Sequence, residues 1–385
     1  MRFLNFDQAA TSFPKAPGVA EAMVQYLLTN GTNINRGTYN LSGEAALVVL
    51  KTREYLAELF HFTEAMEQII FTPGCTWGLN MLLKGYLHAG DHVIVSSLEH
   101  NALMRPLMDL ARQGVTFSRL PANHHGKTKA KDMLNLINAK TKLVAISHAS
   151  NVCGAIFPLA EVAKICQGYQ LPLIVDGAQT AGHLDIDFSA LHLSALCVPG
   201  HKGLMGPQGL GAILFHKEFA KQVEPLITGG TGSASDQERQ PDFLPDKFEA
   251  GTLNLPGIYG LHKALKYILY NGMHNLHLQQ VQLLDKFLQL LKPLPVHIIG
   301  PADSSRQVGV VSLDFPGLDN GKVAFYLEQK YGVLTRCGLH CSPSAHRTLQ
   351  TFPQGTVRFS LGHFTTTQDI EKVVEAISSI CREGR

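Results

Sequence analysis

The sequence predicts an α/β fold in which a large domain with a mostly parallel sheet precedes a smaller α+β domain. Three observations predict it: short apolar runs without polar alternation, segments of helical length between them, and a change of pattern near Gly257. Strands that are covered by helices on both faces are apolar on both faces, so they lack alternation. A chain of 385 residues also fits two domains of ordinary size.

The apolar runs before Gly257 have the length of strands and are rich in Val, Ile, Leu or Phe. They are Gln68–Thr72, His92–Ser96, Leu143–Ser147, Leu171–Asp176, Ala195–Val198 and Gly211–Phe215. Parallel strands need long crossover connections, which are usually helices. The crossover helices that we expect include Glu44–Phe60, Thr76–His88 and Leu159–Gly168.

After Gly257 the order of helices and strands changes. A long helical stretch, Ile258–Lys292, ends at two prolines. The elements that follow are Val308–Phe315, Lys322–Lys330, Val333–Arg336, Thr356–Leu361 and a final helix, Thr367–Arg382. We expect residues 15–257 to form the large domain, and residues 1–14 with 258–385 to form the small one.

Composition excludes several classes of protein. Apolar residues make up 45% of the chain and charged residues 17%, which is not the composition of a disordered protein. The 33 Lys and Arg nearly balance the 31 Asp and Glu, so the net charge gives no reason to expect binding to nucleic acid or to an anionic membrane. No apolar stretch approaches the ~18 residues of a membrane span, and the N-terminus lacks the pattern of a signal peptide. The seven cysteines are an odd, scattered set, so we expect reduced thiols in a soluble, cytoplasmic protein.

Polar side chains follow five of the predicted strands. In open α/β sheets, ligands bind beyond the carboxyl ends of the strands, so these segments should meet at one edge. The segments are Pro73-Gly74-Cys75-Thr76, Leu98-Glu99-His100-Asn101, His148-Ala149-Ser150-Asn151, Asp176-Gly177-Ala178-Gln179 and Pro199-Gly200-His201-Lys202-Gly203.

These residue types suit pyridoxal phosphate. Lys202 is a candidate Schiff-base amine, and Asp176 can hold a pyridinium nitrogen protonated. The helix start at Gly74–Thr76 can bind a phosphate group. His100 could stack on the ring, and Gln179 and Asn151 could bond its phenolic oxygen.

Each element alone is weak evidence. Asp-Gly is an ordinary turn signal, Gly-His-Lys-Gly by itself is more often a loop with a solvated lysine, and a single histidine is more often structural. Their conjunction in this order favours a site.

The order of the motifs Gly-Cys-Thr (74–76), Glu-His (99–100), Ser-Asn-Val-Cys-Gly (150–154), Asp-Gly-Ala-Gln (176–179) and Gly-His-Lys (200–202) resembles the class V aminotransferase family. These are fold-type I enzymes that depend on pyridoxal 5'-phosphate, and the resemblance implies a seven-stranded sheet. Within the family the chain is similar to the branch of cysteine desulfurases and selenocysteine lyases. The likeness extends from residues 6–11 through Arg36-Gly37 and residues 248–252 to Val357-Arg358.

The resemblance implies a role for each matching residue. Lys202 would carry the cofactor, Asp176 would pair with the ring nitrogen, and His100 would stack on the ring and serve as a proton donor. The cofactor-binding set would be Gly74, Cys75, Thr76, His100, Asn151, Asp176, Gln179, His201, Lys202 and Thr252, with Thr252 reaching the phosphate of the partner subunit in a homodimer. The substrate-binding set would be Ala10, Arg36, Asn151, Arg336 and Arg358, in which Arg358 clamps the substrate carboxylate.

The segment Arg336-Cys337-Gly338-Leu339-His340-Cys341 resembles the desulfurase loop that carries the nucleophilic cysteine, here Cys341. The cations Arg336 and His340 would favour its thiolate. Two other interpretations remain open: a buried structural cysteine, and a metal site from Cys337, His340, Cys341 and His346. We favour neither and expect no metal.

Four positions depart from the family's pattern. Pro199 replaces a serine that donates to the phosphate, Tyr39 replaces a histidine, and Trp77 replaces a glutamate. Cys337 adds a thiol that could be a bystander or could resolve a persulfide.

We therefore expect a homodimeric cysteine desulfurase of the group II kind. It would convert L-cysteine to L-alanine, hold the sulfur as a persulfide on Cys341, and pass it to an acceptor protein. The alternatives are a selenocysteine lyase, a class V aminotransferase or β-lyase acting on another small amino acid, and a binding module that has lost turnover.

Overall fold

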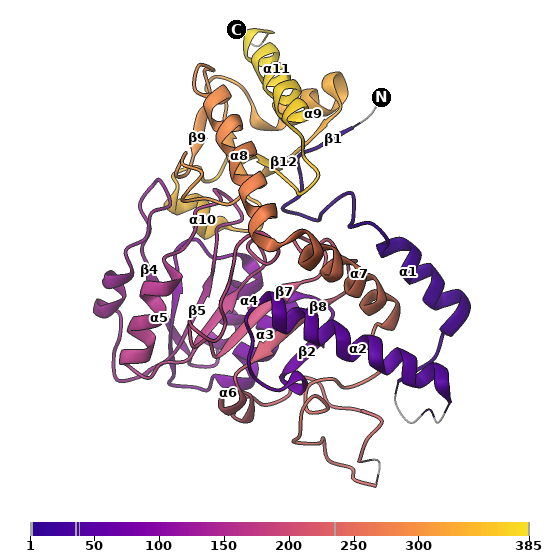
Figure 1. Ribbon diagram of the computed structural model, residues 1–385. Helices are drawn as coiled ribbons and strands as arrows, with labels where there is room; N and C mark the ends of the chain where they lie inside the picture. The colour runs from indigo at the N-terminus through magenta and orange to yellow at the C-terminus, as the bar shows by residue number, and fades with distance from the viewer. Residues whose placement is uncertain (1–2, 35–36, 38, 235, 384–385) are drawn as a thin grey trace.

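The computed structural model describes residues 3–34, 37, 39–234 and 236–383 of the chain and confirms the predicted fold (Figure 1). Its large sheet has seven strands in the order β2-β8-β7-β6-β5-β3-β4. The strands are β2 (Ile69–Thr72), β3 (His92–Ser96), β4 (Thr116–Leu120), β5 (Thr141–Ser147), β6 (Leu173–Asp176), β7 (Ala195–Pro199) and β8 (Gly211–Phe215). Only β8 runs antiparallel to its neighbours within this sheet. Consequently β2, β3, β5, β6 and β7 all end at the same edge.

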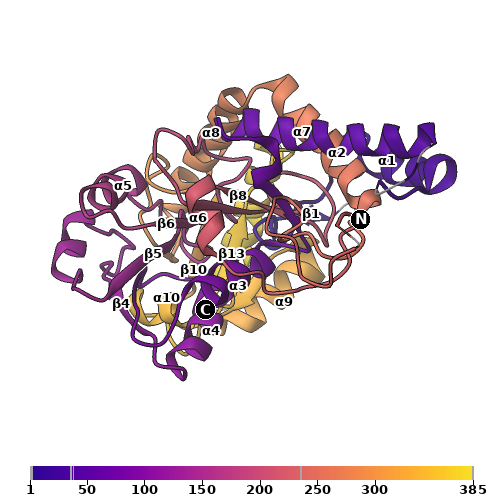
Figure 2. The ribbon, with the colours of Figure 1, turned by 90° about the horizontal axis from the view of Figure 1, so that it is seen from below.

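Helices cover both faces of this sheet, as its apolar strands predict (Figure 2). Alternate residues of β5 lie in different cores: Val144 and Ile146 pack in one, and Leu143 and Ala145 pack in the other. The first core includes residues of α2 (Asn40–Leu59), α5 (Leu159–Gly168) and α7 (Leu255–Asn271), and α1 (Val19–Gln25) packs on α7. The second core includes residues of α3 (Cys75–Tyr86), α4 (Asn101–Ala111) and α6 (Lys217–Gln222).

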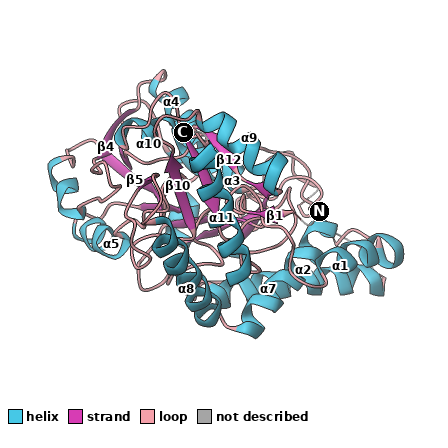
Figure 3. Ribbon diagram, turned by 90° about the horizontal axis from the view of Figure 1, so that it is seen from above, coloured by secondary structure: helices cyan, strands magenta, loops and turns pink. Residues whose placement is uncertain are grey.

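The smaller α+β part is an antiparallel sheet with helices on it (Figure 3). Its strand order is β12-β13-β10-β9, and Phe6, Phe287 and Phe359 meet in its core. The strands are β9 (His297–Ile299), β10 (Val310–Asp314), β12 (Arg336–Gly338) and β13 (Thr356–Ser360); β1 (Leu4–Asn5) pairs with β11 (Val333–Leu334). The helices are α8 (Met273–Leu291), α9 (Asn320–Tyr331), α10 (Pro343–Thr348) and α11 (Thr367–Glu383). Single turns of other helix types lie at Tyr26–Asn30, Met66–Gln68 and Ala130–Asn135.

Three details differ from the sequence-based expectations. The stretch 258–292 is two helices, because the chain turns at Gly272 with φ of 77° between α7 and α8. The stretch 333–336 contributes to two short strands rather than one. Strand β4, at the edge of the sheet, is absent from the predicted runs because most of its side chains are exposed or partly exposed and include Arg119.

The division of the chain at residue 257 stays a prediction. Helix α7 packs against α1 and α2, and its buried residues lie in the core of the large sheet, which favours a boundary after α7. Within the described residues no helix is long and apolar enough to cross a membrane.

Candidate active site

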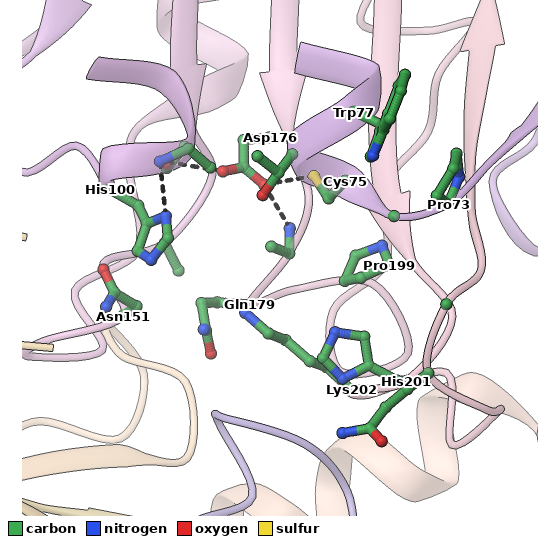
Figure 4. A pocket seen from close by; sticks show the side chains of 18 residues that line it. Pro73, Cys75, Trp77, His100, Asn151, Asp176, Gln179, Pro199, His201 and Lys202 are labelled. Atoms are coloured by element: carbon green, nitrogen blue, oxygen red, sulfur yellow. Dashed lines mark hydrogen bonds between the residues drawn. The ribbon is translucent and has the colours of Figure 1, made fainter. Parts of the chain in front are cut away.

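A cavity of about 370 Å³ lies where the five strands end (Figure 4). Side chains that follow β2, β3, β5, β6 and β7 line it, as the sequence predicts. The residues that line it are Pro73, Gly74, Cys75, Thr76, Trp77, His100, Ala102, Ser147, Ala149, Asn151, Asp176, Ala178, Gln179, Pro199, His201, Lys202, Gln208 and Gly209. All the predicted cofactor-binding residues except Thr252 are therefore in one cavity.

One end of the cavity is the start of helix α3. The first N–H groups of a helix have no partners within it, so those at the start of α3 are available to an anion. Gly211 of β8 packs directly on this turn, since a Cβ on Gly211 would lie 2.9 Å from the Cα of Gly74. At the same end, burial and the charge of Lys202 lower the pKa of His201 to about 4, which leaves a neutral ring. Pro199 contributes neither an N–H nor a hydroxyl group there.

Asp176 ends β6 and is only 4% exposed. Its Oδ1 accepts hydrogen bonds from the backbone N–H of Ala178 at 2.9 Å and from the Cys75 thiol at 3.2 Å. Its Oδ2 lies 3.4 Å from the Ser147 hydroxyl. The thiol of Cys75 thus bonds the carboxylate, and what Cys75 offers to a phosphate is its backbone N–H.

Lys202 lies between His201 and Gly203 in the turn after β7. Burial lowers its pKa, and the charge of Asp176 opposes that shift. The charges of Arg358 and Arg336 lower it further. A lysine with a lowered pKa has a larger fraction of neutral amine, the form that attacks a carbonyl carbon.

His100 is the N-cap of α4, and this position fixes its tautomer. Its Nδ1 accepts a hydrogen bond from the N–H of Ala102 at 2.9 Å. Burial, followed by the charge of Lys202, lowers its pKa to about 4, so the ring is neutral near pH 7. With Nδ1 as an acceptor, the single ring proton must be on Nε2.

Cys341 is an exposed residue on a loop, which we call the thiol loop (residues 339–342), between β12 and α10; its neighbours His340 and Ser342 are buried. His340 and Cys341 both have left-handed backbone conformations, with φ of 48° and 58°, which are uncommon for residues other than glycine. The carbonyl of Cys341 accepts from the N–H of Asn101, next to His100, at 2.8 Å. The loop therefore lies against the rim of the Lys202 cavity.

Asn151 ties the thiol loop to the cavity wall. Its Nδ2 donates to the carbonyl of His340 at 2.7 Å, and its Oδ1 accepts from the hydroxyl of Ser342 at 2.7 Å. Its expected role at the phenolic oxygen of the cofactor stays a prediction.

His340 does not supply the cation that the sequence suggested. Burial, with the charge of Arg358, lowers its pKa to about 2, so the ring is neutral. Its Nε2 bonds the hydroxyl of Thr356 at 3.0 Å, inside the small sheet. Of the two expected cations, only Arg336 carries a charge beside the thiol loop.

Arg358 is 2% exposed and joins three parts of the chain. It donates to the carboxylate of Asp7 at 2.8 Å and to the carbonyl of Asn151 at 3.1 Å. Its Nε has no hydrogen-bond partner within the described residues.

The remaining predicted substrate and phosphate residues lie outside the cavity lining. Ala10, Arg336 and Arg358 do not line the cavity, and Arg36 lies outside the described residues. Thr252 lines a second cavity of about 230 Å³, which shares Pro73, Trp77 and Gly209 with the first. Its expected role toward a partner subunit stays a prediction.

Three site residues had no role in the sequence analysis. Ser147 and Gln208 line the cavity. Glu99, which is fully buried, accepts from the hydroxyl groups of Ser96 and Ser147 at 2.6 Å each. The position of Glu99 just after a predicted strand could have indicated a site residue. The sequence alone, however, does not show whether a carboxylate is buried.

The residues fit pyridoxal phosphate in both chemistry and arrangement. The cavity places a helix start for the phosphate, a buried carboxylate for the ring nitrogen and an amine of lowered pKa around one space. For a metal the described residues give no support, since no group of three or more His, Cys, Asp or Glu among them could hold one.

Comparison with known proteins gives consistent results. The family model of aminotransferase class V matches residues 4–373. A probable cysteine desulfurase of Pyrococcus abyssi is 31% identical over 99% of this chain and 94% of its own. A cysteine desulfurase of Escherichia coli O7:K1 is 31% identical over 98% and 94%. The apo structure of a cysteine desulfurase from Thermococcus onnurineus NA1 has a TM-score of 0.92 at 30% identity, covering 99% of this chain and 95% of that one.

Proposed function

The chain belongs to the class V aminotransferase family, and on that premise we propose that it is a pyridoxal-phosphate-dependent cysteine desulfurase that converts L-cysteine to L-alanine. The observation that carries the proposal is the placement of Cys341. Its side chain is exposed, and its loop is bonded to Asn101 and Asn151 at the rim of the cavity that Lys202 lines. The names of the relatives favour this reaction over those of a selenocysteine lyase or an aminotransferase.

The residues of the cavity would hold the cofactor and move protons. When bound, pyridoxal phosphate supplies an electron sink for the bonds at the substrate's Cα. Asp176 would hold the ring nitrogen protonated, and the start of α3 would hold the phosphate. Lys202 would bind the cofactor through its amine and, once displaced by substrate, would remove the Cα proton. His100 would hold a proton at Nε2, toward the substrate.

Cys341 would take the sulfur. In this step the Cys341 thiolate attacks the sulfur of the bound substrate, so an S–S bond forms and the C–S bond of the substrate breaks. The electron pair of the broken bond stays on the substrate carbon, which takes up a proton and leaves as alanine. The product on the chain would be a Cys341 persulfide, and the exposure of Cys341 suits transfer of the outer sulfur to an acceptor protein. Arg358 would bind the substrate carboxylate with its planar fork.

We further propose that the enzyme is a cytoplasmic homodimer. Two exposed apolar side chains that line the second cavity, Trp77 and Ile227, suit burial against another copy of the chain. Thr252 in that cavity would then face the phosphate of the partner subunit. Cys75, Cys153, Cys166, Cys197, Cys337 and Cys341 are free thiols, which suits a reducing compartment.

Alanine release from L-cysteine tests the proposal. The wild type should release alanine. In Cys341→Ser the rate of alanine release should be lower by ~100-fold or more, while the cofactor absorbance stays the same. Cys337→Ser, also exposed and four residues away, is the matched control and should keep the rate within ~2-fold. Equal alanine release by wild type and Cys341→Ser, or none by either, would overturn the role of Cys341.

A further inference from the structure

The carboxylate of Asp176 has two oxygens in different situations. Oδ1 accepts two hydrogen bonds, from Ala178 N–H at 2.9 Å and from Cys75 Sγ–H at 3.2 Å (Figure 4). A carboxylate oxygen offers about two lone-pair directions, so these two donors fill Oδ1. The ring nitrogen of a cofactor must then be met by Oδ2.

Glu99 keeps Oδ2 available. The Ser147 hydroxyl is 2.6 Å from Glu99 Oε2 but 3.4 Å from Asp176 Oδ2, and it has a single proton. At these distances the proton goes to Glu99, since a good O–H···O bond is about 2.7 Å long. Oδ2 of Asp176 therefore has no close donor among the described residues. Of the two oxygens of this carboxylate, Oδ2 is the one free to accept a hydrogen bond.

Cys75 keeps its proton in this position. The neighbouring thiol of Cys197, burial and the charge of Asp176 all raise the pKa of Cys75 well above its ordinary value. Toward a carboxylate, which has no proton, a protonated thiol is the donor, and Cys75 Sγ lies 3.2 Å from Asp176 Oδ1. Cys75 is also the first residue of α3, so one residue borders both the expected phosphate site and the carboxylate.

We propose that Cys75 is a positioning residue for the cofactor ring, which acts by holding Oδ1 of Asp176 so that Oδ2 is turned toward the ring nitrogen. The inference rests on the proposed function, because it assigns a role toward the same cofactor. Loss of the thiol would leave Oδ1 with one donor, Ala178 N–H, and the carboxylate free to rotate. The ring nitrogen would then be held less well, and each step that needs a protonated ring would slow.

Three variants separate a positioning role from a packing role. Cys75→Val keeps an apolar side chain and removes the donor, and Cys75→Ser keeps a donor. Cys166→Val removes another buried thiol, which lies on α5 outside the cavity lining, as the matched control. We expect Cys75→Val to shift the apparent pKa of the bound cofactor's absorbance by about half a unit and to lower kcat about fivefold, the range of one hydrogen bond. Cys75→Ser should return both values toward wild type, and Cys166→Val should change neither.

A second readout does not depend on the cofactor. In the cofactor-free protein, the Raman S–H stretching band that is lost in Cys75→Ser should lie at the low frequency of a hydrogen-bonded thiol. It should move to higher frequency in Asp176→Asn, where the carboxylate charge is removed.

The two readouts have distinct outcomes. A Cys75→Val enzyme with wild-type absorbance titration and kcat overturns the proposal, and so does a Raman band at the frequency of a free thiol. If the wild type released no alanine, the proposed function would fail, but the Raman band would still decide whether Cys75 is bonded to Asp176.

Discussion

We call Glu99, Asp176, Pro199 and Lys202 the floor of the cavity. The floor and Cys341 of the thiol loop differ in their exposure and in the number of bonds that hold them. In the floor, Asp176 and Glu99 are 4% and 0% exposed, and three of their four carboxylate oxygens accept close hydrogen bonds. In the loop, the Cys341 side chain is exposed, and its backbone has a conformation that few residues other than glycine adopt. The group that would hold a cofactor ring is thus fixed by several hydrogen bonds, whereas the group that would hand over sulfur is presented to solvent. Asn151 is the side chain that lines the cavity and is bonded to the loop.

The largest loss of activity should come from a substitution in the floor, at Lys202. Lys202→Ala removes the amine that would bind the cofactor and move the Cα proton, so alanine release should fall by ~10³-fold or more. The absorbance of bound cofactor should change as well, because the amine that would bond to it is gone. The two variants should therefore differ: Lys202→Ala should change both turnover and absorbance, whereas Cys341→Ser should lose turnover with an unchanged absorbance.

Lys263→Ala is the matched control for that experiment, since Lys263 lies on α7 outside the cavity lining. An unchanged spectrum in Lys202→Ala would contradict the assignment of Lys202 and break the distinction between floor and loop.

Arg358 tests the connection between the two regions. Arg358→Lys keeps the charge and loses the planar fork, so the KM for cysteine should rise about tenfold with a smaller change in kcat. Arg382→Lys, on the last helix, is the matched control. Because Arg358 is buried and bonded to Asp7, the melting temperature should be measured for the same variants. A KM that stays the same in a folded Arg358→Lys enzyme would count against Arg358 as the carboxylate site.

The two regions also differ in how far the sequence predicts them. The floor was predictable because buried parallel strands are recognisable as apolar runs, and because ligands collect at their carboxyl ends. The neutral ring of His340, the direction of the Cys75 thiol and the bonds of Asn151 were not predictable, because each depends on burial by elements distant in the sequence. The edge strand β4 was not predicted for a related reason: because it is largely exposed, its residues do not form an apolar run.

A smaller effect should follow from adding a donor to the floor. Pro199→Ser introduces a hydroxyl at the end of β7, beside the expected phosphate site, so the Kd of pyridoxal phosphate should fall about threefold to fivefold, the value of one hydrogen bond. Binding of pyridoxal, which lacks the phosphate, is the control and should not change. Equal tightening for both ligands would show that the gain is not at the phosphate.

The smallest effect concerns a feature that the two regions share, a buried neutral histidine. Burial lowers the pKa of His148 under the floor, and of His346 next to the thiol loop, to about 4 in each case. The unfolded chain binds the proton at about 6.5, so between pH 6.5 and 4 it binds more protons than the folded chain, and the free energy of unfolding falls as pH falls. One such histidine contributes about 1 kcal/mol per pH unit in this window. His148→Asn should therefore reduce the slope of the free energy of unfolding against pH, measured by chemical denaturation from pH 7 to 4.5. An unchanged slope in His148→Asn would contradict the assignment of a neutral, buried ring to this histidine.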